Sequence, residues 1–229
     1  MRTTIFSLLL FLLIVFGCDK KENPIPLNYG EMDWSLYPEN AAPYPYNFDD
    51  LASNWGINPN SKNILLEDYT GHQCPGCPSA ADTAKQLENN TSLNVIIATI
   101  HAGANGWSDL NQMTDNEWST DFRTEAGITY SNEIPTMDFN PSGTINRKGP
   151  SMYNSSIIWM AGNWRTAVNN EISSQLDLNI QLKYYYYPST NGLFIHTETI
   201  FNNSLDGDYR LIIYLIRDEV VAPQEFPNG

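Results

Sequence analysis

The chain has 229 residues, and its 12 Lys and Arg against 26 Asp and Glu give a formal net charge of −14. The acidic residues are scattered and the basic residues form no cluster, which excludes the phosphate-binding surface that nucleic-acid recognition requires. The length allows a globular domain plus a smaller module, and a hydrophobic fraction of 41% is enough for a packed core with little excess.

Residues 1–17 have the pattern of a signal peptide. A basic start at Met1-Arg2 precedes an apolar run over residues 5–16, which is too short to span a bilayer. The motif Val15-Phe16-Gly17-Cys18 is similar to the bacterial lipoprotein box. This resemblance implies cleavage before Cys18 and a lipid on its thiol, and so an anchor in a membrane. A plain secretory signal, with Cys18 as a spare thiol, is the alternative.

Residues 18–55 follow as the lipidated cysteine and a Pro-rich tether. The prolines at 24, 26, 38, 43 and 45 break any helix in this stretch. Its later part also contains Trp, Tyr and Phe, so we expect that part to pack against the domain that follows.

Residues 56–175 have the pattern of an α/β domain. Residues 63–69 and 94–100 are apolar runs typical of buried parallel strands, and residues 78–90 have the apolar stripe of a helix. A strand, a helix and a strand in this order predict a parallel βαβ unit with a right-handed crossover.

The rest of this domain is predicted from shorter patterns. After a polar loop at 103–115 we expect a second helix at 115–126, and later a long helix at 157–174. Between them, a short strand at 137–140 is expected to form a hairpin with residues 143–147.

Residues 176–229 change to the alternation of β-strands. Strand-like runs at 176–187, 192–201 and 209–216, with turns between them, predict an antiparallel β-meander. Three strands with no partner sheet make a poor domain, so we expect this β module to be incomplete and to continue beyond Gly229 in the natural protein.

The candidate chemistry lies in Cys74-Pro75-Gly76-Cys77, between the first predicted strand and its helix. If Cys18 is lipidated, these two cysteines can pair with each other, bind a metal or react with another protein. The thiolate is the reactive form of cysteine, and a helix N-terminus favours negative charge. The position of the motif therefore suits thiol chemistry.

The predicted order of parts is a strand, the Cys-x-x-Cys motif, a helix, a second strand and a later Ile134-Pro135-Thr136. This order resembles the thioredoxin superfamily. The resemblance implies a mixed sheet flanked by helices, an exposed Cys74 that attacks and a Cys77 that resolves the mixed disulfide. It also implies a cis Pro135 that faces the cysteines, with Ile134 and Thr136 pairing with an extended client. An ordinary trans turn at Pro135 is the alternative.

Asp68 lies six residues before Cys74. In thioredoxins an acid at that spacing lies beneath the second cysteine and helps to move its proton, a role that the resemblance gives to Asp68. Strand alternation leaves a second possibility, in which Glu67 points inward and Asp68 outward. The chain departs from the thioredoxin pattern at Pro78, which predicts that the regular helix begins there with Cys77 as its cap.

A longer stretch narrows the resemblance to one family. It covers residues 65–80, from Leu-Leu-Glu-Asp-Tyr-Thr-Gly to Cys-Pro-Gly-Cys-Pro-Ser-Ala. Together with the lipoprotein box, the long helix and the β tail, they resemble the outer-membrane-protein-28-related lipoproteins over most of residues 64–221. The family implies a bacterial outer-membrane location and a thioredoxin-like core. Asp19, directly after the lipid cysteine, is an inner-membrane retention signal in some bacteria and leaves the inner membrane as the alternative.

These patterns predict an envelope lipoprotein that exchanges disulfides with exported proteins and needs no cofactor. A second hypothesis is a copper or zinc carrier that uses Cys74 and Cys77 with His72 and His101, which we expect at the same sheet edge. A third is a binding or structural module in which the cysteines are a local staple and the tyrosines at 184–187 form a surface.

Overall fold

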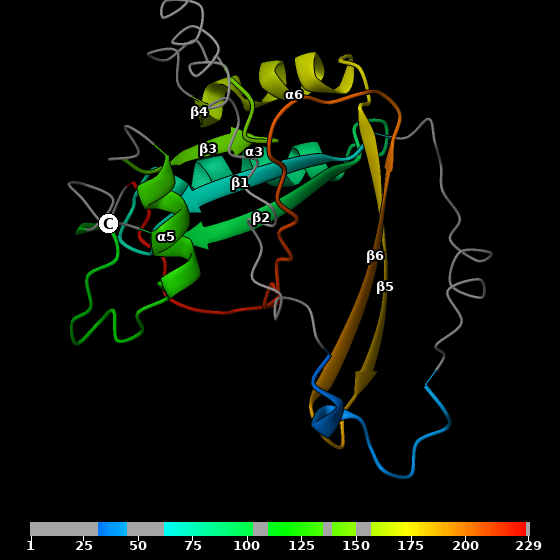
Figure 1. The fold of residues 1–229 in the computed structure, drawn as a ribbon. Helices are drawn as coiled ribbons and strands as arrows, with labels where there is room; N and C mark the ends of the chain where they lie inside the picture. The colour runs from blue at the N-terminus through cyan, green and yellow to red at the C-terminus, as the bar shows by residue number, and fades with distance from the viewer. Residues whose placement is uncertain (1–31, 45–61, 103–109, 135–138, 150–156, 228–229) are drawn as a thin grey trace, which may run out of the picture. The chain divides into compact units, whose positions relative to one another are not determined.

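The computed structural model describes residues 32–44, 62–102, 110–134, 139–149 and 157–227 (Figure 1). The expected signal peptide and Cys18 lie outside these residues. By its internal contacts the chain divides into two compact units, Met1–Trp55 with Leu182–Glu198, and Gly56–Gln181 with Thr199–Gly229. The residues from Thr199 on therefore group with the α/β unit. Among the described residues, no helix combines the length and the apolar character that crossing a membrane requires.

A four-stranded mixed sheet forms the centre of the α/β unit, in the order β2-β1-β3-β4. β1 (Ile64–Thr70) pairs in parallel with β2 (Val95–His101) and antiparallel with β3 (Ser142–Ile145). β3 in turn pairs antiparallel with β4 (Ile158–Met160). The helix α3 (Cys77–Glu88) connects β1 to β2, which confirms the predicted βαβ unit and the mixed α/β class.

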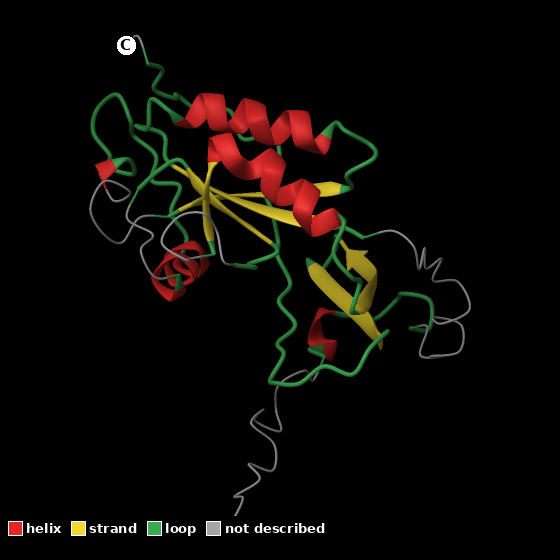
Figure 2. Cartoon of the chain, turned by 90° about the horizontal axis from the view of Figure 1, so that it is seen from above, coloured by secondary structure: helices red, strands yellow, loops and turns green. Residues whose placement is uncertain are grey.

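Helices cover both faces of this sheet (Figure 2). α3 and α6 (Trp164–Ile172) lie on one face, and α5 (Glu125–Glu133) lies on the other. The α3 face buries one set of alternate β1 residues in a cluster of Ile64, Leu66, Ala80, Ala84, Leu87, Ile145, Trp164 and Val168. The α5 face buries the other set in a cluster of Tyr69, Ile100, Ala102, Ile134 and Ile158. β1 is therefore buried on both of its faces.

The second helix was predicted at 115–126, but the structure places α5 at Glu125–Glu133. The Asp115 side chain accepts hydrogen bonds from the backbone N–H groups of Glu117 and Trp118, which makes a turn and not a helix cap. The helix begins instead after Thr124, whose side chain accepts from the N–H of Gly127.

The long helix predicted at 157–174 is also wrong in its first part. Ile158–Met160 is the edge strand β4, because Ile158 is fully buried opposite Thr144 of β3. Only Trp164–Ile172 is α-helical. The strand expected near 143–147 exists as β3, but its partners are β1 and β4. Phe139 and Asn140 form a bend, and residues 135–138 lie outside the described part of the chain.

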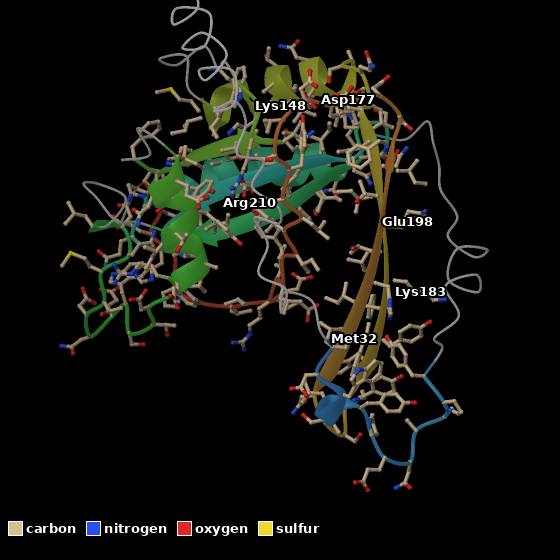
Figure 3. All side chains as sticks on the ribbon, viewed as in Figure 1. Met32, Lys148, Asp177, Lys183, Glu198 and Arg210 are labelled. Carbon is tan, nitrogen blue, oxygen red and sulfur yellow. A yellow bond between two sulfur atoms is a disulfide. The ribbon has the colours of Figure 1, made fainter. Side chains whose placement is uncertain are left out.

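β5 (Leu178–Tyr187) and β6 (Gly192–Phe201) form a separate two-stranded antiparallel sheet. Side chains project from both strands, Lys183 and Glu198 among them (Figure 3). The ammonium of Lys183 lies 5.6 Å from the centre of the Tyr185 ring. The third strand of the predicted meander, at 209–216, is not a strand in the structure. The anchor of that segment is Tyr214, which bonds to the main sheet.

An aromatic cluster joins the Pro-rich segment to the hairpin. The short helix η1 (Trp34–Leu36) lies in this segment. The aromatic rings of the segment stack on one another and on those of the hairpin, edge to face or at a tilt. The members of the cluster are Trp34, Tyr37, Tyr44, Tyr185, Tyr187, Phe194 and His196. Gly192 is required at the turn, because a Cβ there would lie 2.3 Å from the carbonyl oxygen of Leu36.

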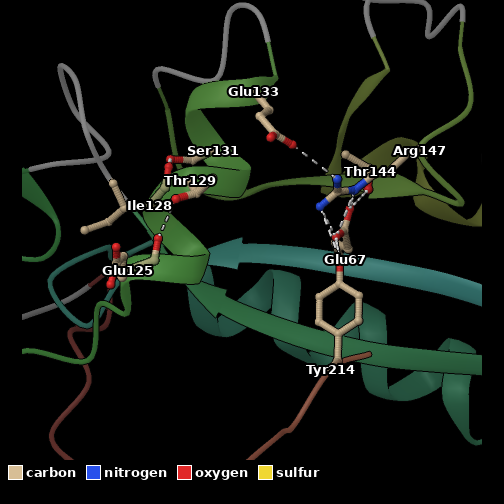
Figure 4. A network of polar contacts seen from close by, with 9 residues as sticks. All are labelled: Glu67, Glu125, Ile128, Thr129, Ser131, Glu133, Thr144, Arg147 and Tyr214. Atoms are coloured by element: carbon tan, nitrogen blue, oxygen red, sulfur yellow. Dashed lines mark hydrogen bonds and ion pairs between the residues drawn. The ribbon is translucent and has the colours of Figure 1, made fainter. Parts of the chain in front are cut away.

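A buried carboxylate network crosses the α5 face of the sheet (Figure 4). Glu67 of β1 is fully buried and accepts two hydrogen bonds of 2.8 Å from Arg147, one of 2.5 Å from Thr144 and one of 2.6 Å from Tyr214. Burial alone raises the pKa of Glu67, but the hydrogen bonds from Arg147, Thr144 and Tyr214 outweigh it and lower the pKa below its ordinary value. Glu67 is therefore held as an anion.

Replacing Arg147 by Met is expected to lower the free energy of unfolding at pH 7 by about 3–5 kcal/mol, because it leaves the Glu67 carboxylate buried and unpaired. The loss shrinks as the pH falls and Glu67 becomes protonated. A carboxyl group whose pKa is lowered by folding adds stability above its ordinary pKa, and this stability is lost as the pH falls through the lowered pKa. Urea denaturation at pH 7 and pH 4 measures both effects.

Two control variants test that interpretation. The double variant Glu67→Met with Arg147→Met removes both charges and should recover most of the lost stability. Lys85→Met removes an exposed ion pair with Glu88 and should leave the stability unchanged. A loss in Arg147→Met that is the same at both pH values would contradict the assigned role of Glu67.

Candidate functional site

The sulfur atoms of Cys74 and Cys77 lie 2.12 Å apart, at disulfide-bonding distance, and their Cα atoms are 5.4 Å apart. Cys77 is the first residue of α3, with Gly76 as its cap, so the helix begins one residue earlier than predicted. Pro78 then occupies the second helical position, where its missing N–H removes no helical hydrogen bond. Cys74 lies before the helix, in the loop that follows β1.

Both cysteines are buried. Each is only 2% exposed, although Pro75 and Gly76 between them are exposed. The expectation of an exposed Cys74 is therefore wrong for this oxidised state. A protein partner can reach the disulfide only if part of its surroundings moves.

A turn after residue 109 holds one side of the loop before Cys74. The buried amide of Gln112 donates to the carbonyl oxygen of Thr70 at 2.6 Å, and the N–H of Gln73 donates to the carbonyl of Asn111 at 3.1 Å. Gly71 is needed for this contact, because a Cβ there would lie 2.7 Å from both Asn111 and Gln112. The end of β1 is thus tightly packed against this turn.

His72 and His101 contact the same turn. The Nε2 atom of His72 lies 2.8 Å from the carbonyl oxygen of Met113, and the Nδ1 atom of His101 lies 3.2 Å from the side-chain oxygen of Gln112. Burial lowers the pKa of His101. No group of three or more His, Cys, Asp or Glu side chains suited to a metal ion occurs among the described residues, which include all four of the ligands considered for a metal carrier.

A segment close to the C-terminus holds the other side of the loop. The N–H of Glu225 donates to the carbonyl oxygen of His72 at 2.8 Å. The Gln224 amide donates to the carbonyl oxygens of Gly71 and Cys74, each at 3.2 Å. The loop with Cys74 is therefore bonded on two sides by segments that are distant in sequence.

A cis peptide bond lies beside the cysteines, between Asn140 and Pro141. A Cβ built on Gly76 would lie 3.4 Å from the Cδ atom of Pro141, so this proline contacts the turn between the two cysteines. Sequence reasoning missed Pro141, although a proline between the strands predicted at 137–140 and 143–147 was a signal that could have identified it.

The residues predicted to bind a client have a different outcome. Pro135 and Thr136 lie outside the described residues, so the cis bond expected at Pro135 stays a prediction. Ile134 ends α5, and its side chain is buried in the apolar cluster on that face of the sheet. Gln112 and Gln224 were not predicted as site residues, and no local pattern marks either of them.

Asp68 is a buried carboxyl group on the α3 face. It is 2% exposed, lies opposite Gly143, and shares its face of β1 with Leu66, which packs in the cluster around α3. Its Oδ1 atom has no hydrogen-bond partner, and burial raises the pKa of Asp68 to about 7. Glu67 and Asp68 are thus both buried, on opposite faces, so the alternative that pointed Asp68 outward is wrong, and the role of Asp68 beneath Cys77 stays a prediction.

Asp68 is expected to make the fold less stable as the pH rises from about 4 to about 7, because the folded state holds this proton more tightly than the unfolded state. Asp68→Asn should remove this dependence and raise the free energy of unfolding at pH 8 by up to about 4 kcal/mol. Denaturation curves across this pH range measure the effect. Asp82→Asn, on the exposed side of α3, serves as the control and should leave the profile as it is in the wild type.

The chain was compared with protein-family models, with curated protein sequences and with solved structures. None of the three comparisons gave a match.

Proposed function

We propose that this chain is a thiol–disulfide exchange protein of the bacterial envelope, with a thioredoxin-like domain and a lipid anchor at Cys18. The observation that carries the proposal is the placement of three features around the start of α3. These are the Cys74–Cys77 pair, the contact of Pro141 with Gly76, and the buried Asp68 on the sheet face that α3 covers.

The reaction uses the two sulfurs in sequence. In the reduced protein, the Cys74 thiolate attacks a disulfide of an exported protein, forms a mixed disulfide and releases one client thiolate. The Cys77 thiolate then attacks the Cys74 sulfur, which frees the second client sulfur and leaves the Cys74–Cys77 disulfide. An external dithiol must reduce this disulfide before the next cycle.

Asp68 supports the second step as a proton acceptor. Cys77 must lose its proton before it can attack, because the thiolate is the nucleophile. A carboxyl group with a pKa near 7 can accept that proton at neutral pH and release it afterwards. The absence of a hydrogen-bond partner on Oδ1 leaves one of its oxygens free for this role.

The location in the envelope is supported by the first 18 residues. A short apolar run that ends in Gly17-Cys18 has the order of a lipoprotein signal. With Cys18 lipidated, no third thiol of this sequence competes with Cys74 and Cys77 for disulfide exchange. The resemblance to the outer-membrane-protein-28-related lipoproteins favours the outer membrane for the anchor.

The exchange activity is expected to depend on Cys74 alone for its first step. Cys74→Ser should abolish insulin reduction in the presence of dithiothreitol, while Cys77→Ser should accumulate a mixed disulfide between Cys74 and the insulin chain. Turbidity measures the first effect, and intact mass under non-reducing conditions measures the second. Circular dichroism verifies that both variants are folded.

Activity in Cys74→Ser equal to that of the wild type would overturn the proposal. The same holds for thiols that stay unreactive in the fully reduced wild type, or for a reduction potential well below about −300 mV, which is typical of a structural disulfide. Those results would favour a binding or structural module in which the pair is a staple.

The anchor is tested separately. Cys18→Ala is expected to lose incorporation of labelled palmitate and to leave the membrane fraction, because acyl chains hold the protein by burying methylene groups. The variant with both Cys74 and Cys77 changed to Ser is the matched control and should keep the label. An unlabelled wild-type protein would show a plain secretory signal.

A further inference from the structure

The segment over residues 222–226, named here the cover segment, lies in an unusual place. It has no helix or strand, yet Gln224 and Glu225 are half-buried while the residues on either side of them are exposed. The Gln224 amide bonds within the segment to the carbonyl oxygen of Glu225, and its other hydrogen bonds and that of the Glu225 N–H fall on the loop that leads into the disulfide. A segment that is bonded to this loop is positioned to control access to it.

One contact is a backbone-to-backbone bond of the kind by which a strand adds to an open edge, from the N–H of Glu225 to the carbonyl oxygen of His72. The loop presents three carbonyl oxygens to the segment, those of Gly71, His72 and Cys74. The segment supplies one backbone N–H, from Glu225, and the two N–H groups of the Gln224 amide. Main-chain bonds of this kind give affinity to any extended polypeptide, and the amide adds selectivity for glutamine.

We propose that the carbonyl edge at residues 71–74 is a docking edge for an extended polypeptide, and that the cover segment occupies it and shields the Cys74–Cys77 disulfide. The disulfide is then closed to partners while the segment is docked and opens when it leaves. This inference rests on the proposed function for its role, because a client or reductant with an extended segment competes for the same carbonyls.

The opposite side of the loop explains why the cover segment is the part that moves. The turn at Asn111 and Gln112 packs against Gly71 so closely that a single Cβ would not fit, and Gln112 is 1% exposed. The cover segment bonds to the loop through hydrogen bonds of 2.8–3.2 Å, its two bonding residues are half-buried and the residues beside them are exposed. Local opening favours the side with fewer buried contacts.

The test measures access to the disulfide without requiring catalysis. The oxidised full chain is treated with excess dithiothreitol, and the thiols formed are trapped with iodoacetamide and counted by mass over time. Glu225→Pro removes the N–H that bonds to His72, and Gln224→Met removes the amide at nearly constant volume. Each is expected to accelerate reduction about two- to tenfold, the range for losing one or two hydrogen bonds.

Glu225→Ala is the matched control, because it removes the side chain but keeps the backbone N–H. It should be reduced at the wild-type rate. Equal reduction rates for the wild type and for both test variants, with all proteins folded by circular dichroism, would contradict the shielding role of the cover segment. A faster rate in Glu225→Ala equal to that in Glu225→Pro would overturn the role of the backbone bond.

The two proposals fail in different ways. If the test variants are reduced faster but insulin reduction does not need Cys74, the cover segment stands and the exchange function falls. If insulin reduction needs Cys74 but the reduction rates of all variants are equal, the exchange function stands and the cover segment falls.

Discussion

The position of β1 between a parallel and an antiparallel neighbour is the constraint on which the site depends. Both faces of β1 are buried, and its register with β3 places Asp68 opposite Gly143 and Glu67 opposite Thr144. A shift by one residue would exchange the faces of the two acids. The paired carboxylate would then lie under α3, and the unpaired one would face Arg147 across the sheet.

Two neighbouring residues of β1 thus have carboxyl groups whose pKa values are shifted in opposite directions. Glu67 receives hydrogen bonds from a guanidinium and two hydroxyl groups, so its charge is compensated within the fold. Asp68 receives none at Oδ1, so burial favours its protonated form. The first acid is held as an anion within the sheet, and the second holds its proton to a higher pH than an exposed carboxyl group does.

The sequence predicted the parts of the fold that follow from local patterns. The apolar runs and the stripe through Ala80, Ala84 and Leu87 were sufficient for β1, α3 and β2. The start of α5 was missed because the side chain of Asp115 makes a turn that resembles a helix cap in sequence. β4 was assigned to a helix because its strand character depends on pairing with Thr144, which lies far away in the chain. The two glutamines at the cysteine loop act through contacts of the same long-range kind.

Tyr214 gives the cover segment a fixed base. Its hydroxyl is bonded to Glu67 at 2.6 Å, and Gln224 is only the tenth residue after it. A fully extended chain of that length reaches at most about 36 Å, so an undocked segment stays near its edge at a local concentration on the order of millimolar. Closing is therefore an intramolecular event, and the fraction of closed molecules is independent of how much protein the cell contains.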